Sequence, residues 1–314
     1  MKQALLAAAA AAILLAPGPP AGAVSTPAFS KISGHFYCLE SAAGSPNTGA
    51  VITPEGILLI DPPPEEEIPG LLNALKAITP RPVRWLAATD YRGARTGGAT
   101  PFLKQGAALI CSREMDRLAA AVPAPDAGLT PAYADPRFVF NGQMRLFPAG
   151  LEIRIIAIRP KARTAGDVIV FVPKDRVLMV GELFDPANYP SIDDSPGDGS
   201  ASGWVDGLKQ AIDSVPLLKS AMPQPKPDPT FPPEPELKLE ESITVIPAHG
   251  APTNLQAMKD LLGVVLKLRS EANRAVAAGR SRESFIGSLA AETYGAYGNL
   301  DVFAGRLFDE LARK

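Results

Sequence analysis

The sequence has no excess of charge of either sign, because its 31 basic and 33 acidic residues leave a net charge of -2. No strong overall field is available to recruit nucleic acid or an anionic membrane, so nucleic-acid binding is not expected. The sequence also contains no Gly-x-Ser-x-Gly motif and no cysteine–histidine signature. A serine or cysteine nucleophile therefore has no support.

Aromatic residues are few, at 6% of the 314 residues, whereas glycine occurs 27 times and proline 33 times. This balance predicts many tight turns around an aliphatic core, in a chain long enough for one large domain or two smaller ones. The two cysteines, Cys38 and Cys111, both lie in apolar stretches typical of strands. They form a disulfide if those strands approach closely, and otherwise they are two buried thiols.

Beyond its N-terminus the sequence has no apolar run long enough to span a membrane, so stable membrane insertion is not expected. Lys2 precedes the apolar run Ala4–Ala16, and Ala21–Ala23 forms an Ala-x-Ala site. These features predict a signal peptide at 1–23, whose removal leaves a mature chain at 24–314. We expect that chain to be exported, as a periplasmic or secreted protein, with an uncleaved N-terminal anchor as the alternative.

Short apolar runs alternate with amphipathic stretches along the mature chain, a pattern typical of an α/β protein. Strands are predicted at 32–40, 49–53, 57–60, 83–88, 107–111, 138–140, 144–147, 151–158, 168–172, 177–180 and 243–246. Helices are predicted at 68–78, 100–105, 112–122, 204–215, 254–279, 282–294 and 302–311, the last three within a C-terminal helical tail at 254–314.

Two of the segments that connect the predicted strands and helices have a distinctive sequence. Asn141-Gly142 predicts a hairpin turn between the strands at 138–140 and 144–147. A proline-dense segment at about 216–236 predicts an extended, solvated insertion. A long surface loop is the simpler interpretation of this insertion, and a partner-binding polyproline segment is the alternative.

The stretch Val83–Thr100 is the one around which the chain is organised. It reads as a buried strand that enters a polar turn at Thr89 and closes at Gly97-Gly98, and sites lie at such strand–loop–helix junctions. The turn carries three charged side chains, those of Asp90, Arg92 and Arg95. Three further polar motifs follow later strands, namely Ala162-Arg163-Thr164-Ala165-Gly166-Asp167, Gly181-Glu182 and Pro247-Ala248-His249-Gly250.

These four motifs resemble those of the metallo-β-lactamase superfamily, whose Thr-His-x-His-x-Asp-His-Thr-Gly-Gly, Ala-His-Thr-x-Gly-Asp, Gly-Asp and Pro-Gly-His-Gly runs hold two zinc ions. The first motif keeps the frame residues Thr89, Tyr91, Gly93, Thr96, Gly97 and Gly98, while its ligand positions hold Asp90, Arg92, Ala94 and Arg95. At the later ligand positions the histidine is replaced by Arg163, the bridging aspartate by Glu182, and only His249 is kept. Asp61 stands where the family has an aspartate after its opening hairpin.

The resemblance implies a four-layer αββα sandwich with mixed sheets and the C-terminal helical tail packed on its outside. Arginine and alanine have no lone pair to offer a metal, so neither zinc nor another cofactor is expected. A single metal ion held by Asp90, Glu182 and His249 is the alternative. Three arginines close to these groups would repel a divalent cation, which makes this alternative the weaker one.

The charges of the residues at these positions suggest which interactions take the place of the metal–ligand bonds. Arg92, Arg95 and Arg163 against Asp90 and Glu182 leave one positive charge in excess, the same sum as two zinc ions with their aspartates and hydroxide. We therefore expect guanidinium–carboxylate pairs in place of metal–ligand bonds, with room for a small anion bound by the arginines.

Three functions are compatible with these residues. The first is a non-catalytic binding or scaffolding protein with an arginine-lined anion pocket. The second is a hydrolase of an ester, lactone or amide, with Asp90, Glu182 and His249 as catalytic residues. The third is a carrier for a small anionic metabolite in the cell envelope. The sequence identifies no protein partner.

Overall fold

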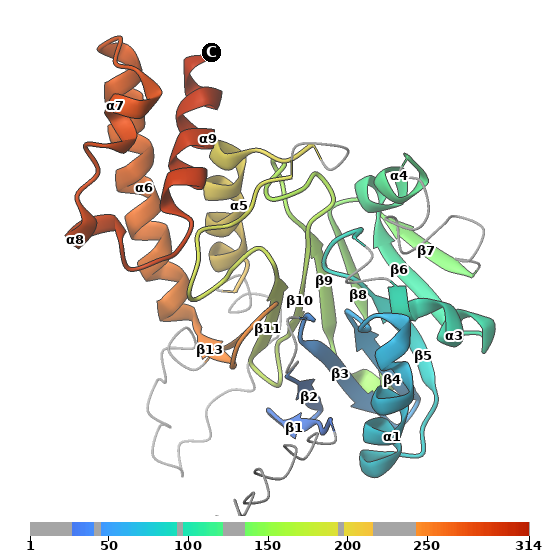
Figure 1. The fold of residues 1–314 in the computed structure, drawn as a ribbon. Helices are drawn as coiled ribbons and strands as arrows, with labels where there is room; N and C mark the ends of the chain where they lie inside the picture. The colour runs from blue at the N-terminus through green and yellow to red at the C-terminus, as the bar shows by residue number, and fades with distance from the viewer. Residues whose placement is uncertain are drawn as a thin grey trace, which may run out of the picture.

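The computed structural model describes residues 27–40, 45–92, 97–121, 136–193, 198–215 and 243–313. Two β-sheets pack face to face, and helices cover the outer face of each (Figure 1). The four-layer αββα architecture expected from the sequence is thereby confirmed. The expected signal peptide, the side chain of Arg95 and the proline-dense insertion lie outside the described residues.

The first sheet has seven strands in the order β1-β2-β3-β4-β5-β6-β7 among the described residues. Its first four strands pair antiparallel, and β4 to β7 pair parallel. The strands are β1 Ser30–Lys31, β2 Phe36–Leu39, β3 Thr48–Thr53, β4 Gly56–Ile60, β5 Val83–Ala87, β6 Ala108–Ser112 and β7 Arg137–Phe140.

The second sheet has six strands in the order β13-β12-β11-β10-β9-β8, again within the described ranges. All its neighbours pair antiparallel except β11 and β12, which are parallel. The strands are β8 Gln143–Leu146, β9 Ile153–Ala157, β10 Val168–Val172, β11 Val177–Gly181, β12 Thr244–Pro247 and β13 Thr253–Asn254.

Helices lie on the outer faces of both sheets (Figure 1). On the first sheet they are α1 Ile68–Ile78, α3 Thr100–Lys104 and α4 Arg113–Ala121. On the second sheet and beyond it they are α5 Ala201–Asp213, α6 Leu255–Ala277, α7 Arg282–Ile286, α8 Ala291–Tyr294 and α9 Leu300–Ala312. None of the helices in the described ranges is long and apolar enough to cross a membrane.

Burial on both faces explains why the central strands are continuous apolar runs. Every residue of β4, β9, β10 and β11 is buried, because the opposite sheet covers one face and helices cover the other. One core cluster lies between the sheets and under α1, α3 and α4, and a second joins the outer face of the second sheet to α5, α6 and α9.

The predicted hairpin at 138–140 and 144–147 is wrong. β7 pairs with β6 in the first sheet, whereas β8 pairs with β9 in the second. The Asn141-Gly142 turn therefore carries the chain from one sheet to the other, with Gly142 in the left-handed region at a φ of 83°. A local turn signal specifies the bend but does not specify which strands pair across it.

The cysteines are free and buried. Cys38 lies in β2 and Cys111 in β6, with three strands of the same sheet between them, so they do not form a disulfide. Burial raises the pKa of each thiol to about 12, which leaves both inert as nucleophiles.

Candidate functional site

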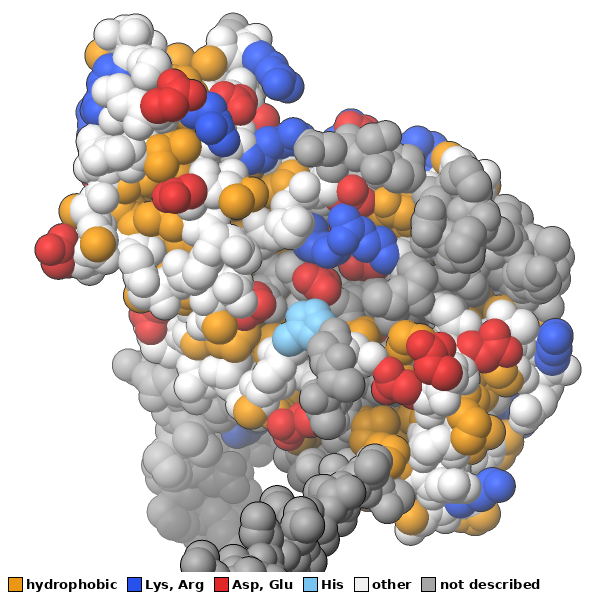
Figure 2. Space-filling view, viewed as in Figure 1, with side chains coloured by type: hydrophobic (Ala, Val, Ile, Leu, Met, Phe, Trp, Pro, Cys, Tyr) orange, Lys and Arg blue, Asp and Glu red, His pale blue; other side chains and the backbone are white. Residues whose placement is uncertain are grey.

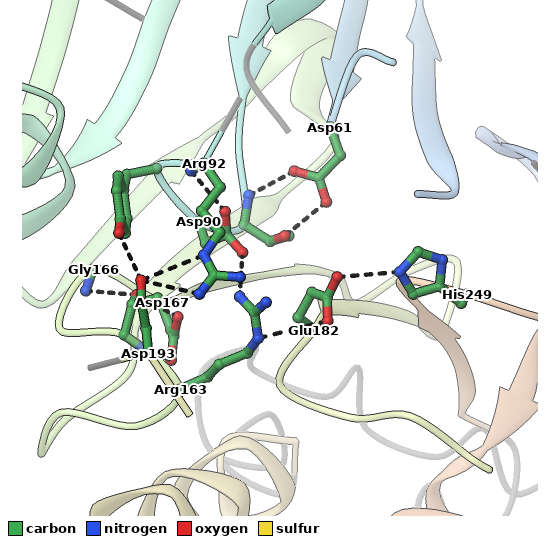
Figure 3. A network of polar contacts seen from close by, with 12 residues as sticks. Asp61, Asp90, Arg92, Arg163, Gly166, Asp167, Glu182, Asp193 and His249 are labelled. Atoms are coloured by element: carbon green, nitrogen blue, oxygen red, sulfur yellow. Dashed lines mark hydrogen bonds and ion pairs between the residues drawn. The ribbon is translucent and has the colours of Figure 1, made fainter. Parts of the chain in front are cut away.

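Four loops that follow strands bring their polar side chains together in one network (Figure 3). The loop after β5 carries Asp90 and Arg92, and the loop between β9 and β10 carries Arg163. Glu182 follows β11, and His249 follows β12. The fold therefore brings together residues separated by as many as 159 positions in the sequence, as the four motifs predict.

Asp61 fixes the point at which β5 leaves the sheet. It is fully buried and follows β4 with a φ of 52°, a left-handed conformation that aspartate tolerates better than most residues. Its Oδ1 accepts the backbone N–H of Thr89 at 2.6 Å, and its Oδ2 accepts the Thr89 hydroxyl at 2.7 Å. The carboxylate thus holds the start of the polar turn with two neutral donors.

Gly181 allows the loop after β11 to approach that same turn. A Cβ atom built on Gly181 would lie 2.0 Å from the Thr89 Oγ1, and the residue has a φ of 54°. A side chain is therefore excluded on both steric and backbone grounds. This close contact places Glu182 directly beside the loop that carries Asp90.

Arg163 is the centre of the site. It is 4% exposed, and its Nη1 donates to the Asp90 Oδ2 at 2.9 Å. Its Nε lies 3.5 Å from the Glu182 Oε2, an ion pair without hydrogen-bond geometry, so this buried N–H has no hydrogen-bond acceptor among the described atoms. One guanidinium therefore lies between two carboxylates, tightly paired with Asp90 and loosely paired with Glu182 (Figure 3).

Arg92 extends the network on the side of Asp193. Its backbone N–H donates to the Asp90 Oδ1 at 2.9 Å, and its Nη2 lies 3.1 Å from the Asp193 Oδ2. The Tyr91 hydroxyl donates to the same Asp193 oxygen at 2.6 Å. Burial, together with the hydrogen bond to Asp193, raises the pKa of Tyr91 to about 12, so the phenol stays protonated.

Asp167, the last residue of the motif that carries Arg163, is a further buried carboxyl, which the sequence did not single out as a site residue. Its Oδ2 accepts the backbone N–H of Thr164 at 3.0 Å, and its Oδ1 accepts the Thr164 hydroxyl at 2.6 Å. Burial raises its pKa to about 7, and the nearby Asp90 adds to this, whereas the bonds from Thr164 lower it. It closes the loop that carries Arg163, as Asp61 closes the loop that carries Asp90.

His249 and Glu182 form the more exposed part of the site. The His249 Nε2 lies 3.1 Å from the Glu182 Oε1, and their side chains are 38% and 27% exposed. Asn47 holds the histidine loop, because its Nδ2 donates to the carbonyls of Pro247 at 3.0 Å and Gly250 at 2.8 Å. In Figure 2 a histidine reaches the surface beside acidic and basic side chains.

Of the six site residues proposed from the sequence, Asp90, Arg163, Glu182 and His249 form one chain of contacts. Arg92 joins this chain through Asp90, and Arg95 lies outside the described residues. Asp193 was missed, because it lies in an irregular loop with no periodic pattern. Its negative charge offsets the positive excess counted from the sequence.

The donors present do not fit the dinuclear zinc site that the resemblance implies. Within the described ranges no group of three His, Cys, Asp or Glu residues could hold a metal ion. The cationic guanidinium of Arg163 lies between Asp90 and Glu182, the two carboxylates that would otherwise contribute oxygen ligands. A divalent cation there would face this fixed charge at short range.

No protein-family model matches the sequence, and no curated protein matches it significantly. Solved structures do match. A metallo-beta-lactamase from Pontibacter korlensis is 19% identical with a TM-score of 0.57, over 75% of this chain and 96% of that one. The mono-zinc form of the metallo-beta-lactamase FIM-1 from Pseudomonas aeruginosa is 17% identical with a TM-score of 0.53, over 74% of this chain and 92% of that one.

A longer match comes from a stereoselective inverting sec-alkylsulfatase, Pisa1, of Pseudomonas sp.. It is 12% identical with a TM-score of 0.65, and the match spans 90% of this chain but 50% of the alkylsulfatase. Identities this low support a shared fold and leave the activity of this chain open. The chain has the metallo-β-lactamase fold, as its motifs predicted.

Proposed function

We propose that this is an exported protein of the metallo-β-lactamase fold that binds a small anion and does not carry out zinc-dependent hydrolysis. The observation that carries the proposal is the place of Arg163, whose buried guanidinium lies between Asp90 and Glu182. The zinc-ligand positions implied by the resemblance hold arginine and alanine, and neither lowers the pKa of a water molecule from 15.7 toward ~7 as zinc does.

The anion site is argued from the unequal pairing of Arg163. Its contact with Asp90 is a buried hydrogen bond, whereas its contact with Glu182 is longer and the glutamate is 27% exposed. An anion that approaches from the Glu182 side would supply the acceptor that the Arg163 Nε lacks. Arg92 and, outside the described residues, Arg95 would provide further guanidinium groups, which suit phosphate, sulfate and carboxylate.

Calorimetry with phosphate, sulfate and acetate tests the anion site. Glu182→Gln should tighten binding, because it removes a competing carboxylate from Arg163, and Arg163→Ala should weaken it. Arg137→Gln is the matched control, since Arg137 pairs with Asp116 at 3.3 Å outside this network. Absence of binding to the parent protein, or equal affinities in both site variants, would show that the arginines serve only as internal ion pairs.

Metal content tests the absence of zinc chemistry. Elemental analysis of the purified mature protein should give well under one zinc per chain, and a chelator should leave the melting temperature unchanged, because bound metal would stabilise the fold by mass action. Two tightly held zinc ions per chain would overturn the proposal.

Export is the remaining part of the proposal. N-terminal sequencing of the secreted or periplasmic protein should begin at Val24, one residue after the Ala21–Ala23 site. A protein that still begins at Met1 would contradict it.

A second candidate function is hydrolysis of an ester, lactone or amide without metal. The contact between His249 and Glu182 favours it, because a carboxylate that holds Nε2 orients the ring and leaves Nδ1 to take a proton from water. In this function Asp90 holds Arg163 in place beside the dyad. Turnover of p-nitrophenyl acetate that persists with chelator and is lost in His249→Ala would support hydrolysis over binding.

A further inference from the structure

A second pocket lies on the outer face of the second sheet, between the β8–β9 pair and α5. Its volume is about 510 Å³, within the range of small-molecule sites, and it shares no residue with the network around Arg163. Gln143 of β8 and Arg154 and Ile156 of β9 line one wall. Asp206, Lys209 and Asp213 of α5 line the other.

Arg154 is the unusual residue of this pocket. Its neighbours Ile153 and Ile155 belong to the core between the sheets, so the alternation of β9 directs Arg154 and Ile156 to the outer face. The arginine is only 6% exposed although it lines the pocket. A buried cation at an apolar sheet surface is costly unless it is paired.

The pairing of Arg154 is incomplete. Its Nε donates to the Glu152 Oε1 at 2.8 Å, and the Nε of Arg145 donates to the same oxygen at 2.7 Å. Burial would raise the pKa of Glu152, but the two arginines more than offset it and the pKa is lowered. One carboxylate thus serves two guanidinium groups, and the Nη atoms of Arg154 have no acceptor among the described residues.

The charged side chains around Arg154 do not cancel its positive charge. Lys209 pairs with Asp213, and Asp206 is engaged by Arg269 at 2.7 Å. Arg159, which also lines the pocket, bonds to the neutral side chain of Asn141. Five cations face three carboxylates, namely Arg145, Arg154, Arg159, Lys209 and Arg269 against Glu152, Asp206 and Asp213.

We propose that this pocket binds a small organic anion, an alkyl phosphate or carboxylate, with its charged group on Arg154. The free Nη atoms offer the two parallel donors that such groups accept, and the buried setting strengthens the contact. Ile156 and Ala157 line the pocket beside the arginine and take the alkyl part. The site is separate from the anion site proposed around Arg163, and either can fail without the other.

Calorimetry with hexyl phosphate, hexanoate and inorganic phosphate tests the proposal. Hexyl phosphate should bind the parent protein at least tenfold more tightly than inorganic phosphate, because each buried methylene adds to affinity. Arg154→Gln should weaken the binding of hexyl phosphate at least tenfold. Gln143→Trp, which fills the pocket from an exposed position and keeps Arg154, should weaken it similarly. Arg137→Gln, a matched arginine variant whose side chain pairs with Asp116 outside both sites, should leave it unchanged, and Arg163→Met reports separately on the Arg163 network.

Circular dichroism establishes that each variant is folded, and Gln143→Trp carries the test if Arg154→Gln does not fold. The proposal is overturned if no probe binds the parent protein at millimolar concentration, or if both pocket variants bind as the parent does. Loss of hexyl phosphate in Arg163→Met would assign the binding to the network instead and would also overturn it. Equal affinities for hexyl phosphate and inorganic phosphate would show that the alkyl chain does not contribute to binding. That result would overturn the proposed ligand class, a small organic anion with an alkyl part.

Discussion

The carboxylates of the site are of two kinds, and they differ in what holds them. Asp61 and Asp167 each accept a backbone N–H and a hydroxyl from a single threonine. Asp90 and Glu182 instead face the guanidinium of Arg163. The first kind closes a loop by accepting hydrogen bonds from neutral donors. The second kind faces a positive charge, that of the Arg163 guanidinium.

This difference has an energetic meaning. A buried ion pair adds little net stability compared with apolar residues of the same shape, but removal of one partner strands the other charge. A carboxylate held by neutral donors leaves two unsatisfied N–H or O–H groups when it is removed. The following predictions separate the two kinds, from the largest expected effect to the smallest.

Arg163→Met should be the most damaging single change. It takes the buried guanidinium away from Asp90, which is 2% exposed, and we expect a loss of about 3–5 kcal/mol of unfolding free energy at pH 7. Urea denaturation measures it. The double variant Arg163→Met, Asp90→Asn should recover part of the loss, and a single variant that costs under about 1 kcal/mol would show that the pair is not the structural centre of the site.

Asp61→Ala should cost about 2–4 kcal/mol, because it leaves the N–H and hydroxyl of Thr89 buried without acceptors. Asp61→Asn should cost less, since asparagine tolerates the φ of 52° and keeps one acceptor. Thermal unfolding of the two variants compares them. Equal losses would mean that side-chain volume, and not hydrogen bonding, sets the importance of this position.

Asp167 should make stability fall as pH rises. Its pKa is raised from 3.8 to about 7 in the folded protein, so the folded state binds more protons than the unfolded state between these values. The contribution is fully present below pH 3.8 and is lost as the pH rises through about 7. Its loss should lower the free energy of unfolding by about 2 kcal/mol between pH 5 and pH 7.

Urea denaturation of the parent protein and of Asp167→Asn at both pH values measures this contribution. The variant should lack it, because an amide does not ionise. The same pH dependence in both proteins would locate the titration elsewhere.

Arg92→Gln should have the smallest effect, under about 1 kcal/mol, because the arginine side chain is 34% exposed and its pair with Asp193 is screened by solvent. The Tyr91 hydroxyl remains as a donor to Asp193 in this variant. Urea denaturation of Arg92→Gln and of Arg163→Met under the same conditions compares the contributions of the two arginines to stability. A loss as large as that of Arg163→Met would make Asp193 a second structural centre.

Much of the fold could be predicted because its elements have local periodicity. The helix at 68–78 has the bounds that its amphipathic pattern predicts, and Ser112 caps α4 through the backbone N–H of Met115 at 3.1 Å, as expected of a serine there. The predicted helix at 282–294 is instead α7 and α8, because α7 ends at Ile286, directly before Gly287. Strand pairing across Asn141-Gly142 is a long-range property, and the local turn signal could not specify it.

The candidate site could be predicted only as far as motif positions allow. Arg163, Glu182 and His249 stand at ligand positions, and the structure places them in successive contact. Asp193 could not be found, since its contact with Arg92 joins two irregular loops about a hundred residues apart. The burial of Asp167 was also beyond the sequence, because it depends on the packing of its whole loop.

The contacts of Asn47 make the site depend on two segments that lie far apart in the sequence. Asn47, directly before β3, donates to the carbonyls of Pro247 and Gly250 through its side chain, and its own N–H donates to the Ala248 carbonyl at 2.6 Å. Some 200 residues lie between these partners, so closure carries a loop entropy that is repaid only when both sheets are in place. A nascent chain that ends before β12 therefore has neither His249 nor the parallel neighbour of β11.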